Sequence, residues 1–182
     1  GNYKQSGALI RCHHKKLIMR NVELRNNINR DDGGAVWIDS NSYLLFDASS
    51  ITNCRARNGG GFYVTGPSST LELNDNTIKN CHAEDMGGGI YGSYVGGWND
   101  IETLTTAPLF EDCTADKGGA VYIIKGCRLK SPRFIRCKAT SKGGALYLGN
   151  NYMNLDNPSF QDSEAPIGSL VYIENGRFVL NG

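Results

Sequence analysis

Apolar residues recur along the chain in short runs, and the runs repeat every 25 to 31 residues. The clearest run follows a pair of glycines, as in Gly33-Gly34-Ala35-Val36-Trp37-Ile38 and Gly118-Gly119-Ala120-Val121-Tyr122-Ile123. Alternation with a period of two predicts a β-strand in each copy. The copies begin at Gly33, Gly59, Gly87, Gly118, Gly143 and, in a degenerate form, Gly168.

A second motif precedes each glycine pair, and a third apolar patch lies between the two motifs. The second motif reads Phe110-Glu111-Asp112-Cys113 in one copy and Phe134-Ile135-Arg136-Cys137 in the next, while Leu44-Leu45-Phe46 represents the third patch. Turn residues separate the runs, so each period predicts three short strands. Three strands in about 25 residues is the length of one coil of a parallel β-helix. A leucine-rich repeat is excluded because its asparagine-leucine consensus and its helical half are missing.

The alternation within the first strand assigns its two faces. One parity is aliphatic and is expected to point inward. The opposite parity carries small residues and then one aromatic residue per coil, and we expect this stripe to face outward, although tyrosine in a core remains an alternative. The expected inward set is Val36, Phe62, Ile90, Val121, Leu146, Val171, Ile38, Val64, Ile123, Leu148 and Ile173. The expected outward set is Ala35, Gly61, Gly89, Ala120, Ala145, Trp37, Tyr63, Tyr91, Tyr122, Tyr147 and Tyr172.

The two motifs together resemble the repeats of the polymorphic outer-membrane protein family. Those repeats read Gly-Gly-Ala-(Ile/Leu/Val) and Phe-x-x-Asn, and the likeness covers about six coils in a fixed order. The family is similar to the pectin-lyase-like group, so the resemblance implies a right-handed β-helix and a surface-exposed adhesin. The chain departs from the family by carrying cysteine at the asparagine position, and we expect no counterpart of the family's membrane barrel in this segment.

We therefore expect an all-β, right-handed parallel β-helix solenoid with three short strands per coil and about seven coils. Residues 1–182 are expected to form a single segment of a longer chain, because the chain opens inside a coil and closes in the second strand of another. The longest period predicts a protruding loop over residues 92–107, since extra residues in a solenoid emerge on one face. Its Tyr94 and Trp98 either bind a partner or cover their own coil.

Four of the six cysteines occupy one position in successive coils: Cys54, Cys81, Cys113 and Cys137. A residue at this position is expected to point inward and to stack on its neighbours. Disulfides joining Cys54 to Cys81 and Cys113 to Cys137 are one interpretation. We favour free, stacked thiols, because parallel Cβ atoms about 4.8 Å apart are wider than the ~3.8 Å that a disulfide prefers.

Composition and charge exclude several classes of protein. The chain has 19 Lys and Arg against 18 Asp and Glu, a net charge of +1, so it lacks the basic excess of a nucleic-acid binder. It has no apolar run long enough for a membrane span, and we expect none in this segment. We expect an extracellular or cell-surface location. An intracellular assembly remains an alternative, since the chain has no Asn-x-Ser/Thr acceptor.

Two further groups suggest chemistry at first sight. Cys12-His13-His14 could contribute to a metal site, but zinc needs about four converging ligands and only His82 remains to help. Asp31-Asp32 suggests a glycosidase pair, but it occupies an ordinary polar turn of the repeat. We therefore expect no catalytic residues, no metal and no cofactor.

The expected function is that of a non-catalytic structural or adhesive rod, part of a larger surface or filament-type protein. The aromatic stripe, with Tyr94 and Trp98, is its expected interaction surface, and the expected partners are proteins, or further coils of the same chain at both ends. A glycan is an open alternative, and nucleic acid is not expected. Alternative functions are a carbohydrate-binding or polysaccharide-degrading protein of the same fold, and a module docked in a large intracellular assembly.

Overall fold

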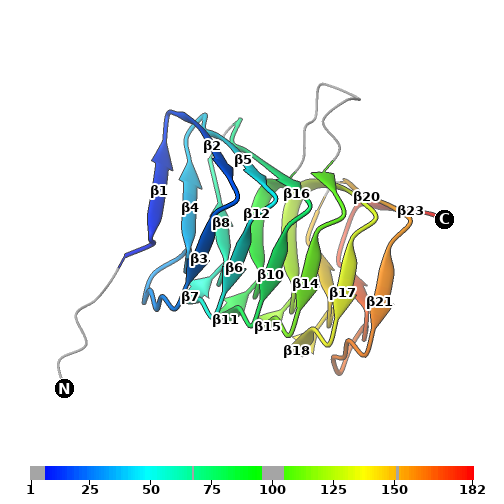
Figure 1. Cartoon of the computed structure of the whole chain (residues 1–182). Coiled ribbons are helices and arrows are strands. Elements are labelled where there is room, and N and C mark those ends of the chain that lie inside the picture. Colours follow the sequence, from blue (N-terminus) through cyan, green and yellow to red (C-terminus); the bar gives the residue numbers. More distant parts are fainter. Residues whose placement is uncertain (1–6, 67, 96–104, 151) are drawn as a thin grey trace, which may run out of the picture.

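The computed structural model describes residues 7–66, 68–95, 105–150 and 152–182, and in this part of the chain it contains strands and no helix. The strands are short and parallel, and they stack coil upon coil into a rod (Figure 1). Two sets of strands run along adjacent faces of the rod and are joined through the long strand β16 into one 13-stranded sheet. A 6-stranded and a 4-stranded sheet complete the coil.

The first set contains seven strands, so the chain makes about six turns. These strands are β1 (Ile10–His13), β4 (Val36–Asp39), β8 (Phe62–Val64), β12 (Ile90–Val95), β16 (Val121–Lys130), β19 (Leu146–Leu148) and β22 (Val171–Ile173). The second set is β2 (Lys16–Arg20), β5 (Tyr43–Asp47), β9 (Thr70–Asn74), β13 (Thr105–Thr106), the end of β16, β20 (Tyr152–Asp156) and β23 (Arg177–Asn181).

The remaining two sheets come from the run that the sequence predicts as a single strand around the cysteine motif. The 6-stranded sheet is β3 (Glu23–Arg25), β6 (Ser50–Thr52), β10 (Thr77–Lys79), β14 (Leu109–Glu111), β17 (Arg133–Ile135) and β21 (Ser159–Gln161). The 4-stranded sheet is β7 (Arg55–Asn58), β11 (His82–Met86), β15 (Thr114–Lys117) and β18 (Lys138–Lys142). A complete coil such as β4 to β7 thus contains four strands, because a bend divides the third predicted run.

The bends are made by residues with a left-handed backbone, in three columns along the rod. The first glycine of each pair forms one column, with φ between 61° and 75°. The residue before each column cysteine forms another, and it is mostly Asn or Asp, which tolerate this conformation better than other side chains. The third column precedes the 6-stranded sheet and consists of Asn21, Ala48, Asp75, Ala107, Ser131 and Asn157.

Equivalent residues stack in register, and they fill the core as the alternation predicts. Val36 pairs with Phe62, which pairs with Ile90, which pairs with Val121, and all four side chains are fully buried. At the last coil the core opens: Val171, the end of this column, is half-buried, and Ile173, the end of the column that begins at Cys12 and Ile38, is 41% exposed.

The predicted outward position of the small residues is wrong. Ala35, Ala120 and Ala145 are completely buried, and a Cβ built on Gly89 would lie 3.0 Å from the ring of Phe110. The glycine pair bends the chain immediately before these small residues. Inward and outward side chains therefore alternate only from the first residue of the strand, such as Val36, onward. The small size of this position leaves room for the large inward residues of the 6-stranded sheet.

Candidate interaction surface

The six aromatic residues of the stripe form one continuous ladder, as their register predicts. Successive ring centroids from Trp37 to Tyr172 are 5.3, 5.0, 5.5, 4.5 and 5.0 Å apart. The rings of Tyr63, Tyr91 and Tyr122 are nearly parallel, with interplanar angles of 8°. Each pair of this kind is worth ~0.5 to 1.5 kcal/mol, so the ladder stabilises the stacking of coils in addition to forming a surface.

The ladder is less exposed than the sequence predicts. Trp37, Tyr63, Tyr91, Tyr122 and Tyr172 are half-buried, and Tyr147 is only 1% exposed. For Tyr147 the prediction of an outward, accessible side chain is therefore wrong. Its ring has a ladder neighbour on each side and its hydroxyl hydrogen-bonds Glu174, and these contacts remove it from solvent.

Neighbouring rings occupy the ring faces in the interior of the ladder. Each ring packs against its neighbours, the Arg11 guanidinium lies 4.3 Å from the Trp37 ring centroid, and the Lys142 ammonium lies 4.5 Å from that of Tyr172. The surface therefore offers ring edges and hydroxyl groups. Burial, followed by the neighbouring Tyr63 and Tyr122, raises the pKa of Tyr91 to about 12, so this hydroxyl stays neutral at physiological pH.

Most of the predicted loop, including Trp98, falls in the gap between residues 95 and 105 that the structure does not describe. The backbone of Tyr94 belongs to β12 and pairs with Gly126, but its side chain and the whole of Trp98 lie outside the described residues, as do residues 96–104 of the predicted loop. The interaction surface considered below is therefore the ladder and its flanks.

The four column cysteines lie inside the rod, and all are fully buried and free. The Sγ atoms of Cys81, Cys113 and Cys137 lie 3.9, 3.5 and 3.6 Å from the carbonyl oxygens of Ile51, Ile78 and Phe110 in the preceding coil. The column ends in Asn27 on one side and Ser163 on the other, both buried. These thiols thus serve as small core groups that link neighbouring coils. The two cysteines outside the column, Cys12 and Cys127, are also free and buried.

The cysteine column leads to a prediction about alkaline pH. A hydrogen bond with Cys113 and burial raise the pKa of Cys137, and burial raises the pKa of Cys54. The folded protein thus keeps thiol protons that the unfolded chain loses above pH ~8.5, so the contribution of these thiols to the free energy of unfolding should be constant below that pH and fall as pH rises above it. Urea unfolding at pH 8 and 9.5 measures this, and Cys137→Ala should reduce the difference.

Thiol reactivity provides the companion measurement. Without reductant, Ellman's reagent should find six thiols in the unfolded chain and react slowly with the native protein, because the thiols are buried. Fewer than six thiols in the unfolded chain would show that disulfides had formed, and rapid reaction of the native protein would contradict the buried column.

The structure divides Asp31-Asp32, the glycosidase-like pair considered from the sequence, into one buried and one exposed carboxylate. Asp32 is 7% exposed and accepts hydrogen bonds from Asn58 Nδ2 at 2.9 Å and from Arg57 Nε at 3.2 Å, both in the next coil. Asp31 is exposed. Asp32 therefore joins two coils beside the bend at the glycine pair Gly33-Gly34, which is a structural role.

Asp32→Asn is expected to lower the free energy of unfolding by about 1 to 2 kcal/mol, because the charged acceptor of two inter-coil donors is lost. Asp31→Asn is the matched control and should change it by less than about 0.5 kcal/mol. Chemical denaturation measures both. Equal effects of the two substitutions would show that Asp32 does not join the coils.

The sequence analysis missed a cluster around Asp39. His13 Nδ1 lies 2.5 Å from Asp39 Oδ1, and Arg11 Nη2 donates to Asp39 Oδ2 at 3.3 Å. Asp39 is 8% exposed and directly follows His13 in the register of β1 and β4. The cluster could have been predicted from the register of β1 and β4, which places His13 and Asp39 in one column. Cys12 points into the core, and His82 hydrogen-bonds Thr114, so the Cys12-His13-His14 and His82 group considered from the sequence does not converge.

Ion pairs in the described part of the chain follow one rule. Apart from the pair between Arg25 and Glu23, each joins neighbouring coils; Arg20 with Asp47 and Arg136 with Asp112 are examples, at 3.1 and 2.8 Å. The described residues contain no group of three or more His, Cys, Asp and Glu that could hold a metal ion. They also contain no helix long and apolar enough to cross a membrane.

Comparison with known proteins identifies the fold and leaves the activity open. A family model described as a right-handed β-helix region matches residues 2–165. The searches of curated proteins and of solved structures found no match. The match covers most of the chain and agrees with the parallel solenoid described above.

Proposed function

The chain belongs to the right-handed β-helix family, and from this premise we propose that it is a non-catalytic structural rod that presents an interaction surface within a larger surface or filament-type protein. The resemblance to polymorphic outer-membrane repeats supports the cell-surface setting, which is part of the proposal. The observation that carries it is the uniformity of the described coils: core, ladder, thiols and ion pairs repeat from coil to coil.

The polar chemistry of the described residues supports a structural role. Most of their ion pairs join neighbouring coils, and Asp32 satisfies donors at a glycine corner. A glycosidase needs two carboxyl groups about 5 to 9.5 Å apart around a sugar, with one of them free to change its protonation. Asp32 is held by Arg57 and Asn58, and this favours the rod over the enzyme.

The ladder favours a protein partner over a glycan. Sugar rings bind aromatic side chains by stacking on an open ring face, and the ring faces inside the ladder are covered by neighbouring rings, while Arg11 covers Trp37 at the N-terminal end. Ring edges and tyrosine hydroxyls are surfaces that protein partners use, since tyrosine is enriched at protein interfaces. The carbohydrate-binding alternative would rest on Trp98, outside the described residues.

A polysaccharide panel tests the proposal. The protein is incubated with pectin, polygalacturonate and other acidic and neutral polysaccharides, and reducing ends and unsaturated products are measured. We expect no product. Product formation that Asp32→Asn or Asp39→Asn abolishes, with the fold intact, would overturn the non-catalytic rod.

A glycan array separates the second alternative. We expect no glycan binding by the full chain. Binding that is lost in Trp98→Ala and kept in Trp37→Ala would establish a carbohydrate-binding loop and would contradict the protein-binding rod.

A further inference from the structure

The aromatic ladder brings six easily oxidised side chains into one unbroken row. Successive ring centroids from Trp37 to Tyr172 are between 4.5 and 5.5 Å apart, so each ring is in contact with the next. Electrons pass between aromatic rings in contact far more readily than across a gap of several side chains. The ladder is therefore a path along which an electron vacancy can move from ring to ring.

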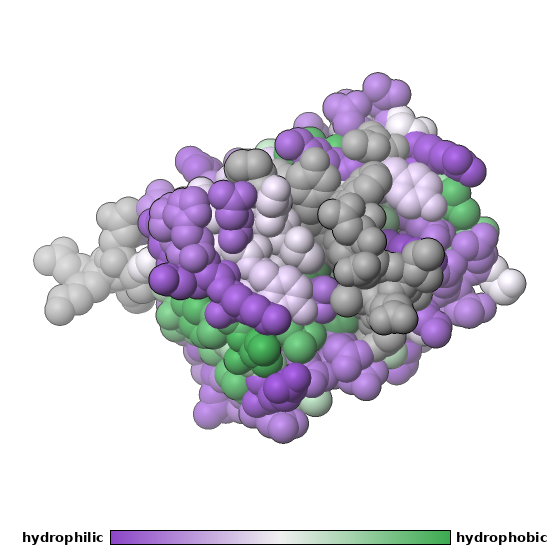
Figure 2. All heavy atoms as spheres, turned by 90° about the horizontal axis from the view of Figure 1, so that it is seen from above, coloured by the Kyte–Doolittle hydropathy of each residue, from purple (hydrophilic) through white to green (hydrophobic). Residues whose placement is uncertain are grey.

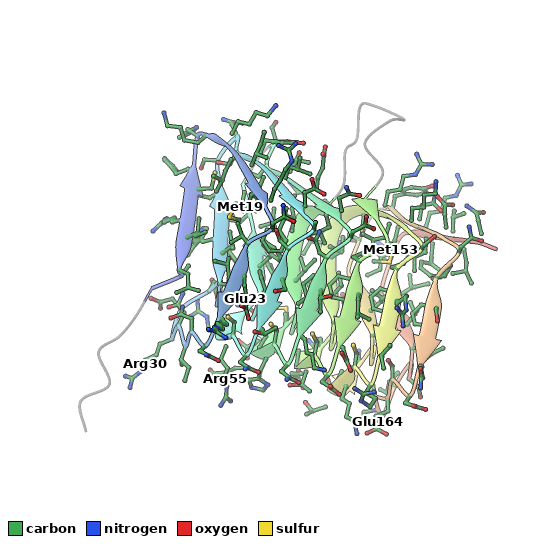
Figure 3. All side chains as sticks on the ribbon, viewed as in Figure 1. Met19, Glu23, Arg30, Arg55, Met153 and Glu164 are labelled. Atoms are coloured by element: carbon green, nitrogen blue, oxygen red, sulfur yellow. The ribbon has the colours of Figure 1, made fainter. Side chains whose placement is uncertain are left out.

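The entry point of such a vacancy is Trp37. Charged, polar and aliphatic side chains hold their electrons more tightly than aromatic rings, and Figure 2 shows hydrophilic residues over most of one face of the rod, with hydrophobic residues gathered in its N-terminal half. The oxidisable thioethers of Met19 and Met153 are buried near opposite ends of the second strand set (Figure 3). Trp37 is half-buried, and indole is oxidised more easily than phenol, so a small oxidant in solution takes an electron there.

Two features of Trp37 prevent the vacancy from staying on its ring. Loss of an electron leaves a positive charge on the indole, and the Arg11 guanidinium, 4.3 Å from the ring centroid, repels that charge. The Trp37 radical cation would be stabilised by giving its Nε1 proton to a base, but Nε1 is buried and has no hydrogen-bond partner among the described residues. Both features favour transfer of an electron from Tyr63, whose ring centroid is 5.3 Å away.

Tyr147 is the member of the ladder best placed to keep the vacancy. Its hydroxyl hydrogen-bonds Glu174, an exposed carboxylate within reach of the phenol proton. A tyrosine that loses both an electron and a proton becomes a neutral radical, so burial of its ring carries no penalty for a buried charge. Since Tyr147 is only 1% exposed, other molecules cannot reach the radical.

The other charged partners of the ladder are less suited to this role. Tyr63 also hydrogen-bonds a carboxylate, that of Asp32, but Asp32 already binds the Arg57 guanidinium, and protonation would cost that ion pair. Lys142 Nζ donates to the Tyr172 hydroxyl at 3.1 Å, and an ammonium group cannot accept the phenol proton. Tyr147 with Glu174 is therefore the favoured resting place.

The buried thiols do not compete with the ladder at neutral pH. Cysteine is oxidised far more readily as a thiolate than as a thiol. A hydrogen bond with Cys113 and burial raise the pKa of Cys137, and burial raises the pKa of Cys127. These groups therefore stay protonated, and the vacancy stays on the aromatic rings.

We propose that the ladder carries an electron vacancy from Trp37, where a small diffusible one-electron oxidant creates it, to Tyr147, where it rests as a buried tyrosyl radical. The oxidant takes one electron from Trp37 and is reduced. The three tyrosines between them pass the vacancy on: each ring is restored by an electron from the next, and each half-buried hydroxyl releases its proton and regains it. At Tyr147 an electron leaves the ring and the phenol proton moves to Glu174, so the net products are the reduced oxidant, one neutral radical and one carboxylic acid.

Pulse radiolysis with the azide radical tests the proposal, because this oxidant takes electrons from indole in preference to phenol and becomes azide. The full chain carries Trp98→Phe in every sample, so that Trp37 is the only tryptophan. We expect the tryptophanyl absorbance to decay as the tyrosyl absorbance rises, with a common rate constant that does not change with protein concentration. The tyrosyl radical should then persist, because Tyr147 is buried.

Conservative variants locate the path and its end. Tyr91→Phe keeps a stacked ring that is hard to oxidise, and it should abolish the persistent radical. Tyr147→Phe and Glu174→Gln should each shorten the lifetime of the tyrosyl radical, because the first removes the resting place and the second removes its proton acceptor. Tyr43→Phe is the matched control and should change nothing, since the Tyr43 hydroxyl donates to the Glu72 carboxylate at 2.5 Å but lies outside the ladder.

Decay of the tryptophanyl signal without a tyrosyl rise would overturn the proposal, and so would a rate proportional to protein concentration. An effect of Tyr147→Phe no larger than that of Tyr43→Phe would also overturn it, with circular dichroism showing that both variants are folded. None of these outcomes depends on polysaccharide products, so failure of the electron path can be told apart from failure of the non-catalytic rod.

Discussion

Gly119→Ala is expected to destabilise the fold by about 4 kcal/mol or more, enough to unfold a domain of ordinary stability. A Cβ at this position would lie 2.2 Å from the carbonyl oxygen of Gly144 and 2.5 Å from that of Lys138. Both are backbone atoms of the next coil, so neither can move without separating the two coils. The loss should appear in chemical denaturation, or as failure to recover folded protein.

Gly149→Ala is the matched control, because a Cβ there would meet its nearest atom, the carbonyl oxygen of Ile123, at 3.5 Å. This is an ordinary van der Waals distance, and the free energy of unfolding should change by less than about 0.5 kcal/mol. If Gly119→Ala were tolerated as well as Gly149→Ala, the coils would not approach each other as closely as described. The second glycine of the other pairs has the same environment, which explains why it recurs.

Phe134→Ala is expected to lower the free energy of unfolding by about 3 to 5 kcal/mol. Its side chain is completely buried and lies between two further rings, with centroids 5.2 Å from Phe110 and 5.1 Å from Phe160. Removing the ring leaves a cavity in the middle of a stack, and the neighbouring coils cannot collapse into it without losing their register. Thermal and denaturant unfolding measure the effect.

Phe160→Ala provides the comparison, since Phe160 occupies the same column in the last coil and is half-buried. Its removal should cost roughly half as much or less, because one side of the ring is already open. Phe134→Leu should recover most of the loss, because it keeps the column filled. Equal costs for Phe134→Ala and Phe160→Ala would contradict a core whose columns open at the end of the rod.

The stacked columns of side chains could be predicted from the sequence, because residues that are one repeat apart in a solenoid lie next to each other in neighbouring coils. Tyr91 and Tyr122 are 31 residues apart, and Tyr122 and Tyr147 are 25 apart, yet both pairs stack. The differing spacings are absorbed in loops, so the motifs themselves give the register. The inward residues Val36 and Val121 followed from the same argument.

Features that depend on bends were not predictable from alternation. Ala35 and Ala120 lie at the glycine corner, where the chain changes direction, and they are buried instead of exposed. The single strand expected around each cysteine motif is divided at a left-handed residue, such as Asp112. Alternation describes a straight strand and gives no position for a bend, although the recurring Asn and Asp were a local signal for it.

The sequence predicted which residues form the aromatic ladder, but it did not predict how far each of them is exposed to solvent. The register brought Trp37 to Tyr172 together, but exposure depends on groups from other positions, such as Glu174 against Tyr147. The Asp39 cluster escaped for a similar reason, since Asp39 belongs to no repeated motif and acquires His13 and Arg11 only through the pairing of β1 with β4.

Spin-label distances along one outward column test the stacked, in-register coils most directly. Glu23, Ser50, Arg133 and Ser159 belong to the column of the 6-stranded sheet that continues through Thr77 and Leu109. At about 4.8 Å per coil, labels at Ser50 and Arg133 should be about 14 Å apart and labels at Glu23 and Ser159 about 24 Å apart, and the buried native cysteines should remain unlabelled. Distances that follow sequence separation instead of coil number would contradict the account.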